Sequence, residues 1–276
     1  MEGDQILEVL DETARAVRSA LDDLDYWGPV GTREGQYGCD LAADAAALEV
    51  LLGAGFGVLS EESGLTSSER DVLVVVDPVD GSTNAARGLP WFATSLCALD
   101  ADGPLAAVVV NQATGEHFSA LRGGGARRNG VVMSPAGAGG LSGPLSGGQV
   151  PGPSGPLRGV PGPSGCLVLA EAMVAVTSTP PQALGWRQVR ALGAVALDLC
   201  AVACGHLDAY IDCSVGTHGP WDYLGAMLVC TEAGAPIVDL SGRDLVTRLP
   251  GERRSPVAAA TPELLAEAVA ARSRFS

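Results

Sequence analysis

The segment DVLVVVDPVDGSTN, residues 71–84, joins an apolar run to two acids, a turn sequence and hydroxyl side chains. The consecutive apolar residues 72–76 predict a buried strand that ends directly on Asp77. The proline and glycine in DPVDG favour a tight reversal, so we expect the carboxylates of Asp77 and Asp80 to converge at a sheet edge, where ligands bind in such folds. The alternative is that D-P-x-D-G forms only a turn.

The residues that follow Asp80 favour an anion. Ser82, Thr83 and Asn84 predict the start of a short helix whose free N–H groups and hydroxyls face the same volume. Carboxylates beside an anion repel it unless a cation lies between them. Oxygen ligands without a neighbouring His or Cys favour Mg²⁺, which takes its remaining ligands from water and phosphate. The segment therefore predicts a phosphate bridged to the protein by metal.

Two other segments supply further acids. Glu61 and Glu62 follow a short predicted strand, and Asp222 lies in the first turn of an apolar helix, GPWDYLGAM. Asp222 could equally act as a cap or as a partner of the helix dipole. Taken together, acids at two strand ends and one helix start suit a multi-metal site assembled between two parts of the chain. His218, four residues before Asp222, could contact a substrate or lie in solvent.

Composition excludes several classes of chemistry. The 276-residue chain has 17 basic residues, all of them arginine, against 32 acids, for a formal charge of -15. Without lysine, mechanisms that need a Schiff-base, P-loop or kinase-type lysine are excluded. Nucleic acid is a poor candidate partner, because the tight arginine pairs are limited to Arg127/Arg128 and Arg253/Arg254.

The apolar content favours a globular protein. With 47% hydrophobic residues, the chain has ample surface for a core. Its longest apolar runs are strand-sized and its acidic N-terminus does not resemble a secretory signal, so we expect no membrane span and a cytoplasmic location. The seven cysteines lack C-x-x-C spacing, which argues against a disulfide framework or zinc site and predicts mostly buried thiols.

Periodicity predicts a helix pair followed by a largely antiparallel sheet. The helices are expected over 6–24 and 41–52, and the strands near 57–59, 72–76, 93–99, 105–111 and 116–121. Residues 134–165, rich in Gly and Pro, are typical of a loop or hinge. Beyond them, we expect strands near 208–212 and 236–238, helices near 195–204 and 221–233, and a last strand and helix within 256–272. Strands and helices therefore alternate in this half of the chain. We predict one unit over 1–276 with lobes over 1–133 and 166–276.

The motifs resemble those of the inositol monophosphatase family, a branch of the lithium-sensitive, Mg²⁺-dependent phosphatase superfamily. The matching patterns are E-E-S at 61–63, D-P-[ILV]-D-G-[ST]-x-N at 77–84, and W-D-x-x-[AG] leading to E-A-G at 221–234. Order and spacing agree from about residue 41 to 239. The resemblance implies a layered αβαβα sandwich of the inositol monophosphatase/fructose-1,6-bisphosphatase type, an α+β fold with α/β alternation.

The resemblance also implies roles for individual residues. Two or three Mg²⁺ ions are expected, one held by Glu61, Asp77 and the carbonyl of Val79, and a second by Asp77, Asp80 and Asp222. The nucleophile would be a water activated by metal, with Glu61 among the catalytic residues, and oriented by the Ser82 hydroxyl and an upstream aspartate. We match that aspartate to Asp44, with Asp40 as the second choice. The second metal would stabilise the leaving alkoxide.

The implied substrate-binding residues are Asp80, Gly81, Ser82, Thr83, Gly193, Ala194, Asp212 and Asp222. Gly81 and Ser82 would bind phosphate through backbone N–H groups, and Gly193 and Ala194 match a family loop near the substrate. Asp212 stands where the family carries a substrate-binding glutamate. The following DCSVGTHGPWD is longer than in typical inositol phosphatases, a difference that bears on substrate and not on metals.

The function implied is hydrolysis of a small phosphate ester, such as inositol monophosphate or a similar polyol or amino-alcohol phosphate. Histidinol-phosphatase, 3'(2'),5'-bisphosphate nucleotidase and fructose-1,6-bisphosphatase activities remain as alternatives on the same site. A regulatory binding protein built on a phosphatase fold is an alternative of another class. The resemblance further implies a homodimer, although nothing in the sequence shows the interface.

Overall fold

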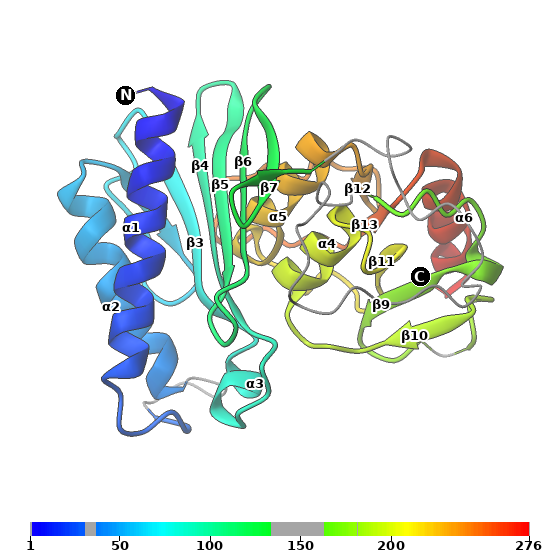
Figure 1. Cartoon of the computed structure of the whole chain (residues 1–276), viewed down its shortest axis with the longest axis horizontal. Helices are drawn as coiled ribbons and strands as arrows, with labels where there is room; N and C mark the ends of the chain where they lie inside the picture. The colour runs from blue at the N-terminus through cyan, green and yellow to red at the C-terminus, as the bar shows by residue number, and fades with distance from the viewer. Residues whose placement is uncertain (1, 31–36, 134–162, 181, 276) are drawn as a thin grey trace.

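The protein forms five layers in the order helix, sheet, helix, sheet, helix (Figure 1). This computed structural model describes residues 2–30, 37–133, 163–180 and 182–275. The predicted αβαβα sandwich is therefore confirmed. Most of the predicted loop over 134–165 lies outside the described residues.

The first layer consists of two long helices packed against each other. Helix α1 covers Gly3–Asp22 and helix α2 covers Gly38–Gly53. The apolar residues of α1 recur at helical spacing, which buries Ile6, Leu10 and Val17 against the neighbouring sheet. Both predicted helices are confirmed, with α1 ending earlier and α2 starting earlier than expected.

The second layer is an eight-stranded sheet with the order β2-β1-β3-β4-β5-β6-β7-β8. Its strands are β1 Gly57–Ser60, β2 Gly64–Thr66, β3 Leu73–Asp80, β4 Ala93–Asp100, β5 Gly103–Asn111, β6 His117–Leu121, β7 Gly125–Arg128 and β8 Val131–Val132. All pairings are antiparallel except that of β1 with β3. Along β3, Val74 and Val76 face the first helix layer whereas Val75 faces the opposite side, so both faces of the strand are buried.

The third layer lies between the two sheets. It consists of α4 Val195–Ala203 and α5 Pro220–Ala233, which contact each other. Every residue of α4 is buried, because sheets and α5 surround it. This position explains why both helices are apolar on nearly all sides.

A five-stranded sheet and one helix complete the fold. The sheet has the order β10-β9-β11-β13-β12 and contains β9 Met173–Thr177, β10 Gln188–Arg190, β11 Ala209–Asp212, β12 Ile237–Asp239 and β13 Pro256–Ala259. Helix α6, Pro262–Arg272, covers its outer face. Short helical turns are α3 Ser82–Ala86, η1 Leu169–Glu171 and η2 Ser273–Phe275.

The sequence prediction missed the short strands β2, β7, β8 and β10. Each has two to four residues, and most of these residues are exposed or half-buried, so they lack a distinctive apolar run. Among the described residues, no helix has both the length and the apolar character that a membrane crossing needs.

Candidate active site

A β-bulge in β3 sets the direction of the two acids of the DPVDG motif. Asp77 pairs with Ser95 and Asp80 pairs with Ala93, so β3 contains one residue more than β4 over this stretch. Without the extra residue, side chains three apart would point to opposite faces of the sheet. The bulge therefore lets Asp77 and Asp80 share one side. The Thr94 hydroxyl donates to the Pro78 carbonyl at 2.9 Å and fixes the bulge.

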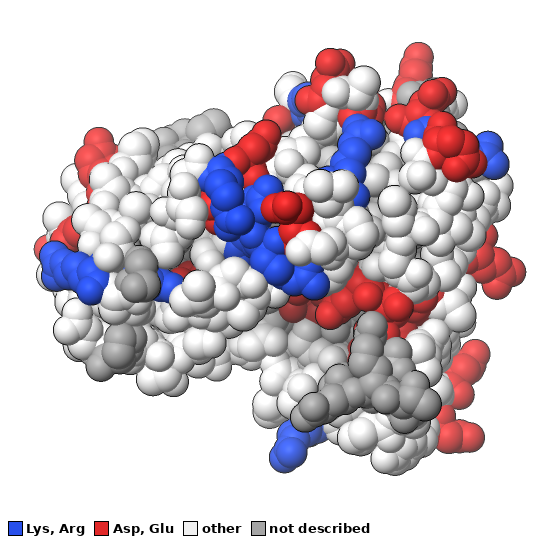
Figure 2. Space-filling model, turned by 180° about the vertical axis from the view of Figure 1, so that it is seen from behind, with Lys and Arg blue, Asp and Glu red and all other residues white. Residues whose placement is uncertain are grey.

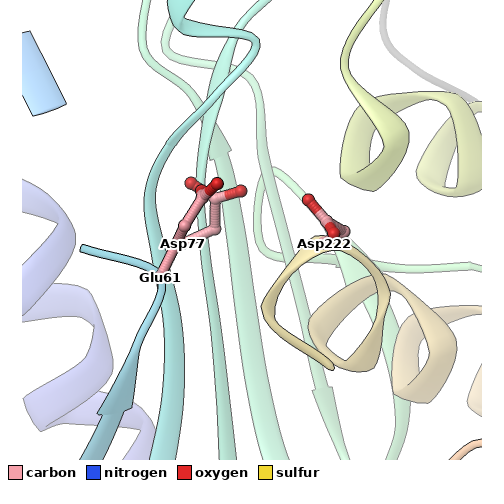
Figure 3. Close-up of side chains that lie close together, drawn as sticks. All are labelled: Glu61, Asp77 and Asp222. Carbon is pink, nitrogen blue, oxygen red and sulfur yellow. The ribbon is translucent and has the colours of Figure 1, made fainter. Parts of the chain in front are cut away.

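Three carboxylates from separate elements meet at this edge of the sheet (Figure 3). Glu61, Asp77 and Asp222 each offer one oxygen, and these oxygens lie within 4.8 Å of one another. The Glu61 N–H donates to the Val76 carbonyl at 3.2 Å, which continues the parallel pairing of β1 with β3 and places Glu61 beside Asp77. Asp222 approaches from the first turn of α5, where it also accepts a 2.6 Å bond from the Gly219 N–H.

Without a bound cation, the surroundings of these acids disfavour the charged form of each carboxyl. Burial first, and then the charges of Glu61 and Asp80, hold the pKa of Asp77 well above its usual range. Burial and Asp222 raise the pKa of Asp80 in the same way. Burial and the charges of Asp222, Glu62 and Asp40 raise the pKa of Glu61 to about 8, although part of this side chain stays open to solvent. A hard divalent cation would remove this repulsion, so the oxygen donors fit a metal of that kind.

The turn after β3 packs against the start of α4. Asp80 accepts a 2.7 Å bond from the Ala196 N–H. Gly81 has φ +87°, and a Cβ there would lie 3.0 Å from the Gly193 carbonyl and 3.1 Å from the Ala194 Cβ. The predicted phosphate-binding residue Gly81 is thus in contact with the predicted substrate residues Gly193 and Ala194. Asn84 ties the two segments together by donating to the Leu192 carbonyl at 2.7 Å.

The two candidate aspartates of α2 occupy different surroundings. The Ser82 hydroxyl makes a small contribution that lowers the pKa of Asp40, and the charge of Asp40 acts on both Glu61 and Asp77. Asp44 instead accepts hydrogen bonds from the hydroxyls of Ser60 and Ser63. The sequence prediction preferred Asp44, and this choice stays a prediction; Ser82 acts on the pKa of the second choice, Asp40. Of the other predicted residues, Thr83 is exposed and contacts the Tyr37 hydroxyl at 3.3 Å.

The second half of the chain contributes a histidine between two acids. His218 is buried, with its ring nitrogens 3.6 Å from Asp212 and 3.7 Å from Asp222. Burial opposes its charge, but Asp212 and Asp222 outweigh this and raise the pKa of His218 to about 10. The solvent-exposed alternative for His218 is therefore wrong. One oxygen of the fully buried Asp212 has no hydrogen-bond partner among the described residues.

The sequence analysis missed Asp198. This residue lies in α4 and is 1% exposed; one oxygen accepts a 2.9 Å bond from the Trp91 indole N–H. Burial raises the pKa of Asp198 to about 7, and its charge acts on Asp80. A single acid within the apolar stretch AVALDLCAVA was the available signal.

The chain is similar in sequence to proteins from several organisms. The chain is 34% identical over 190 residues to an inositol-1-monophosphatase of Mesorhizobium japonicum, which covers 68% of the chain and 65% of that protein. It is 30% identical over 210 residues to a fructose-1,6-bisphosphatase of Pyrococcus furiosus (75% and 70% covered). It is 31% identical over 189 residues to the Nus factor SuhB of Xylella fastidiosa (68% and 62% covered), so the aligned region spans less than two thirds of that relative.

The fold and the family profile agree with these matches. A solved inositol monophosphatase from Anabaena superposes with a TM-score of 0.73 at 21% identity, covering 99% of this chain and 97% of that one. The profile of the inositol monophosphatase family matches residues 40–276. The chain belongs to the inositol monophosphatase family, a family of phosphoric monoester hydrolases.

Proposed function

We propose that this protein is an Mg²⁺-dependent phosphomonoesterase that acts on a small hydroxylated substrate. The observation that carries the proposal is the convergence of Glu61, Asp77 and Asp222 within 4.8 Å, with the pKa values of Glu61 and Asp77 raised. The Gly81–Ser82 turn lies directly after these acids and can receive a phosphate.

The acids of the site would hold the metal. Glu61, Asp77 and the Val79 carbonyl form one ligand set, and Asp77, Asp80 and Asp222 form the second. Bound divalent cations neutralise phosphate charge and lower the pKa of a water, and Mg²⁺ suits all-oxygen ligands. Asp77 belongs to both sets and accepts a 3.0 Å bond from the Val79 N–H, which orients its carboxylate.

Ser82 and Asp40 are proposed to orient the attacking water. Ser82 acts on the pKa of Asp40, so we place the two side chains on either side of a water, which would then have a fixed direction toward the phosphate. Burial raises the pKa of Asp40 to about 6, which suits a group that accepts a proton near neutral pH.

The opposite wall of the site is proposed to bind the alcohol portion of the substrate. Gly193 and Ala194 lie against Gly81, and the unpaired oxygen of Asp212 can accept a bond from a substrate hydroxyl. Thr83, which is exposed, is a further proposed substrate-binding residue. A buried carboxylate oxygen without a hydrogen-bond donor favours a substrate with several hydroxyl groups over an apolar alcohol.

A substrate panel tests the proposal. Phosphate release would be measured from inositol 1-phosphate, histidinol phosphate, 3'-phosphoadenosine 5'-phosphate and fructose 1,6-bisphosphate, each with Mg²⁺ and with EDTA. We expect turnover of at least one ester with Mg²⁺ and none with EDTA. Equal turnover in EDTA, or none of any ester at any Mg²⁺ concentration, would contradict the proposal.

A binding role is the second candidate, favoured by the match to the Nus factor SuhB of Xylella fastidiosa. It does not require the acids to converge, so the site geometry makes it secondary. A stable macromolecular complex in a pull-down, together with no Mg²⁺-dependent turnover, would favour it. The homodimer and the cytoplasmic location stay predictions, and size-exclusion chromatography with light scattering checks the former.

A further inference from the structure

One acid of the central helix layer is buried and takes no part in the proposed chemistry. Asp198 of α4 is 1% exposed, and its Oδ2 has no hydrogen-bond partner among the described residues. Its Oδ1 accepts a 2.9 Å bond from the Trp91 indole N–H. A carboxylate oxygen left unpaired in an apolar interior costs stability, so packing alone does not explain this acid. What the acid contributes to the structure is its bond to Trp91.

This bond connects α4 to the segment between α3 and β4. The Trp91 side chain is half-buried and packs against the cluster of apolar residues that includes α4. The backbone of Trp91 is held as well, because its carbonyl accepts a 2.8 Å bond from the Asn84 side-chain amide. Trp91 thus links Asp198 on α4 to Asn84, which comes two residues after Ser82.

The Trp91 carbonyl also lies against the turn that is proposed to bind phosphate. Gly81 has φ +87°, and a Cβ there would lie 3.1 Å from the Trp91 carbonyl oxygen and 3.0 Å from the Gly193 carbonyl oxygen. These two carbonyls enclose the turn and leave no room for a side chain. Moving Trp91 would open the enclosure and free the N–H groups of Gly81 and Ser82 to change direction.

Helix α4 holds this turn at two points. The Ala196 N–H donates to Asp80, directly before Gly81, at 2.7 Å, and the Asp198 side chain holds Trp91. Figure 2 shows acidic side chains gathered in a recess between the two halves of the molecule. Because the turn belongs to one half of the chain and α4 to the other, the two bonds fix the halves against each other where the phosphate is proposed to lie.

We propose that Asp198 is a positioning residue that holds Trp91 against α4 and thereby fixes the Gly81–Ser82 turn in the geometry that receives the substrate phosphate. The inference rests on the proposed function and adds to it a residue outside the proposed ligand and substrate-binding sets. Backbone N–H groups bind phosphate best when their direction is fixed beforehand, because ordering them on binding costs free energy. The negative charge of Asp198 repels phosphate, so the turn benefits from its hydrogen-bond acceptor and not from its charge.

Two uncharged substitutions separate the acceptor from the charge. Asp198→Asn keeps an oxygen that can accept from Trp91, Asp198→Leu replaces it with a similarly branched apolar side chain, and both remove the charge. Isothermal titration of inorganic phosphate into each protein in Mg²⁺ measures the dissociation constant. We expect a value about tenfold higher for Asp198→Leu than for Asp198→Asn. For an ester that the enzyme hydrolyses, KM should rise in the same ratio while kcat changes by less than about threefold.

Trp91→Phe removes the other partner of the same bond. It keeps an aromatic ring against the core but lacks the indole N–H, so the dissociation constant of phosphate should again rise about tenfold. The double variant Trp91→Phe/Asp198→Leu should bind phosphate no more weakly than either single variant, because both residues act through one bond. Trp186→Phe is the matched control, since Trp186 is also half-buried but packs in the cluster beside α6. Thermal melts of all variants report on folding.

The outcomes separate this inference from the proposed function. No Mg²⁺-dependent turnover of any ester by the wild type contradicts the function, while the phosphate titrations still decide the inference. Equal phosphate affinity of folded Asp198→Leu and Asp198→Asn would show that only the charge matters, and it overturns the inference. Additive losses in the double variant, or a folded Trp91→Phe that binds phosphate as tightly as the wild type, overturn it as well and leave the phosphatase intact. A wild type that binds no phosphate in Mg²⁺ also overturns it.

Discussion

Two groups of acids in this protein differ in how their charge is balanced. At the ends of β1 and β3, Glu61, Asp77 and Asp80 have other acids as neighbours, and their pKa values are raised. In the second sheet, burial of Asp212 and Asp239 is outweighed by His218 and Ser214 for the first and by Arg243 and Ser255 for the second, and both pKa values are lowered.

The difference separates acids that need an outside cation from acids that do not. A buried carboxylate is stable when the protein supplies donors or a cation, as it does for Asp239. Asp77 and Asp80 accept bonds from backbone N–H groups but face other acids without a cation, so they oppose folding at neutral pH unless a cation binds them. The uncompensated group is therefore the part of the site where metal is expected, and the compensated acids need no metal.

The largest expected effect comes from removing an uncompensated acid. Asp77→Asn should lower kcat by at least about 10³-fold, because Asp77 belongs to both proposed ligand sets. The metal-free variant should be more stable than the metal-free wild type, since one repelling charge is gone. Steady-state kinetics and thermal melts with and without Mg²⁺ measure both effects.

Asp239→Asn is the matched change in the compensated group. It should lower the free energy of unfolding by about 2 kcal/mol, since it weakens a charged pair and a bond from the Ser255 N–H. Its Mg²⁺ affinity should stay at the wild-type value. If instead Asp239→Asn lost Mg²⁺ binding and Asp77→Asn kept it, the distinction between the groups would be wrong.

The aspartates of α2 sharpen the comparison at the edge of the site. Asp40→Asn should lower kcat by about 10²-fold with little loss of stability, because Asp40 is the partner of Ser82. Asp44→Asn should instead reduce stability by about 1 kcal/mol, because it weakens the bonds from Ser60 and Ser63. Parallel kinetic and denaturant measurements would show the opposite pattern if Asp44 orients the water.

His218 links the two groups, so its removal should have an intermediate effect. His218→Gln removes the ring that lies between Asp212 and Asp222 and positions the proposed ligand Asp222, and this loss of positioning should weaken Mg²⁺ binding by about tenfold. Isothermal titration with Mg²⁺ would measure the change, with His206→Gln as the matched histidine variant. An unaltered Mg²⁺ affinity would show that Asp222 is oriented without His218.

The smallest effect concerns pH. Because folding raises the pKa of Glu61 from 4.5 to about 8 and raises those of Asp77 and Asp80, the native state binds more protons than the unfolded chain across this range. The metal-free protein should therefore lose stability as pH rises from about 5 to about 8, by a few degrees in Tm. Mg²⁺ should stabilise more at pH 8 than at pH 5. A Tm of the metal-free protein that rises with pH would contradict the raised pKa values.

Sequence reasoning located the elements that carry the acids, because their signals are strong. Five apolar residues before Asp77 predict a buried strand, and the apolar run after Asp222 predicts a buried helix. It preferred Asp44 to Asp40, but helical periodicity does not distinguish them, since residues four apart lie on the same face of a helix. That choice depends on Ser60 and Ser82, which reach α2 only through tertiary structure.

Other features depended on pairing across the sheet. The bulge that turns Asp77 and Asp80 to one side is defined by the register of β3 with β4, which no local pattern shows. Local signals thus identified the chemistry, and long-range packing set its geometry.

The most direct test of the account is an anomalous difference map from crystals grown with Mn²⁺ in place of Mg²⁺. The account predicts a peak among the carboxylates of Glu61, Asp77 and Asp222, absent in crystals of Asp77→Asn, and no peak at Asp212 or Asp239. An active enzyme whose crystals show no Mn²⁺ at the three carboxylates, or show it at the compensated acids instead, would contradict it.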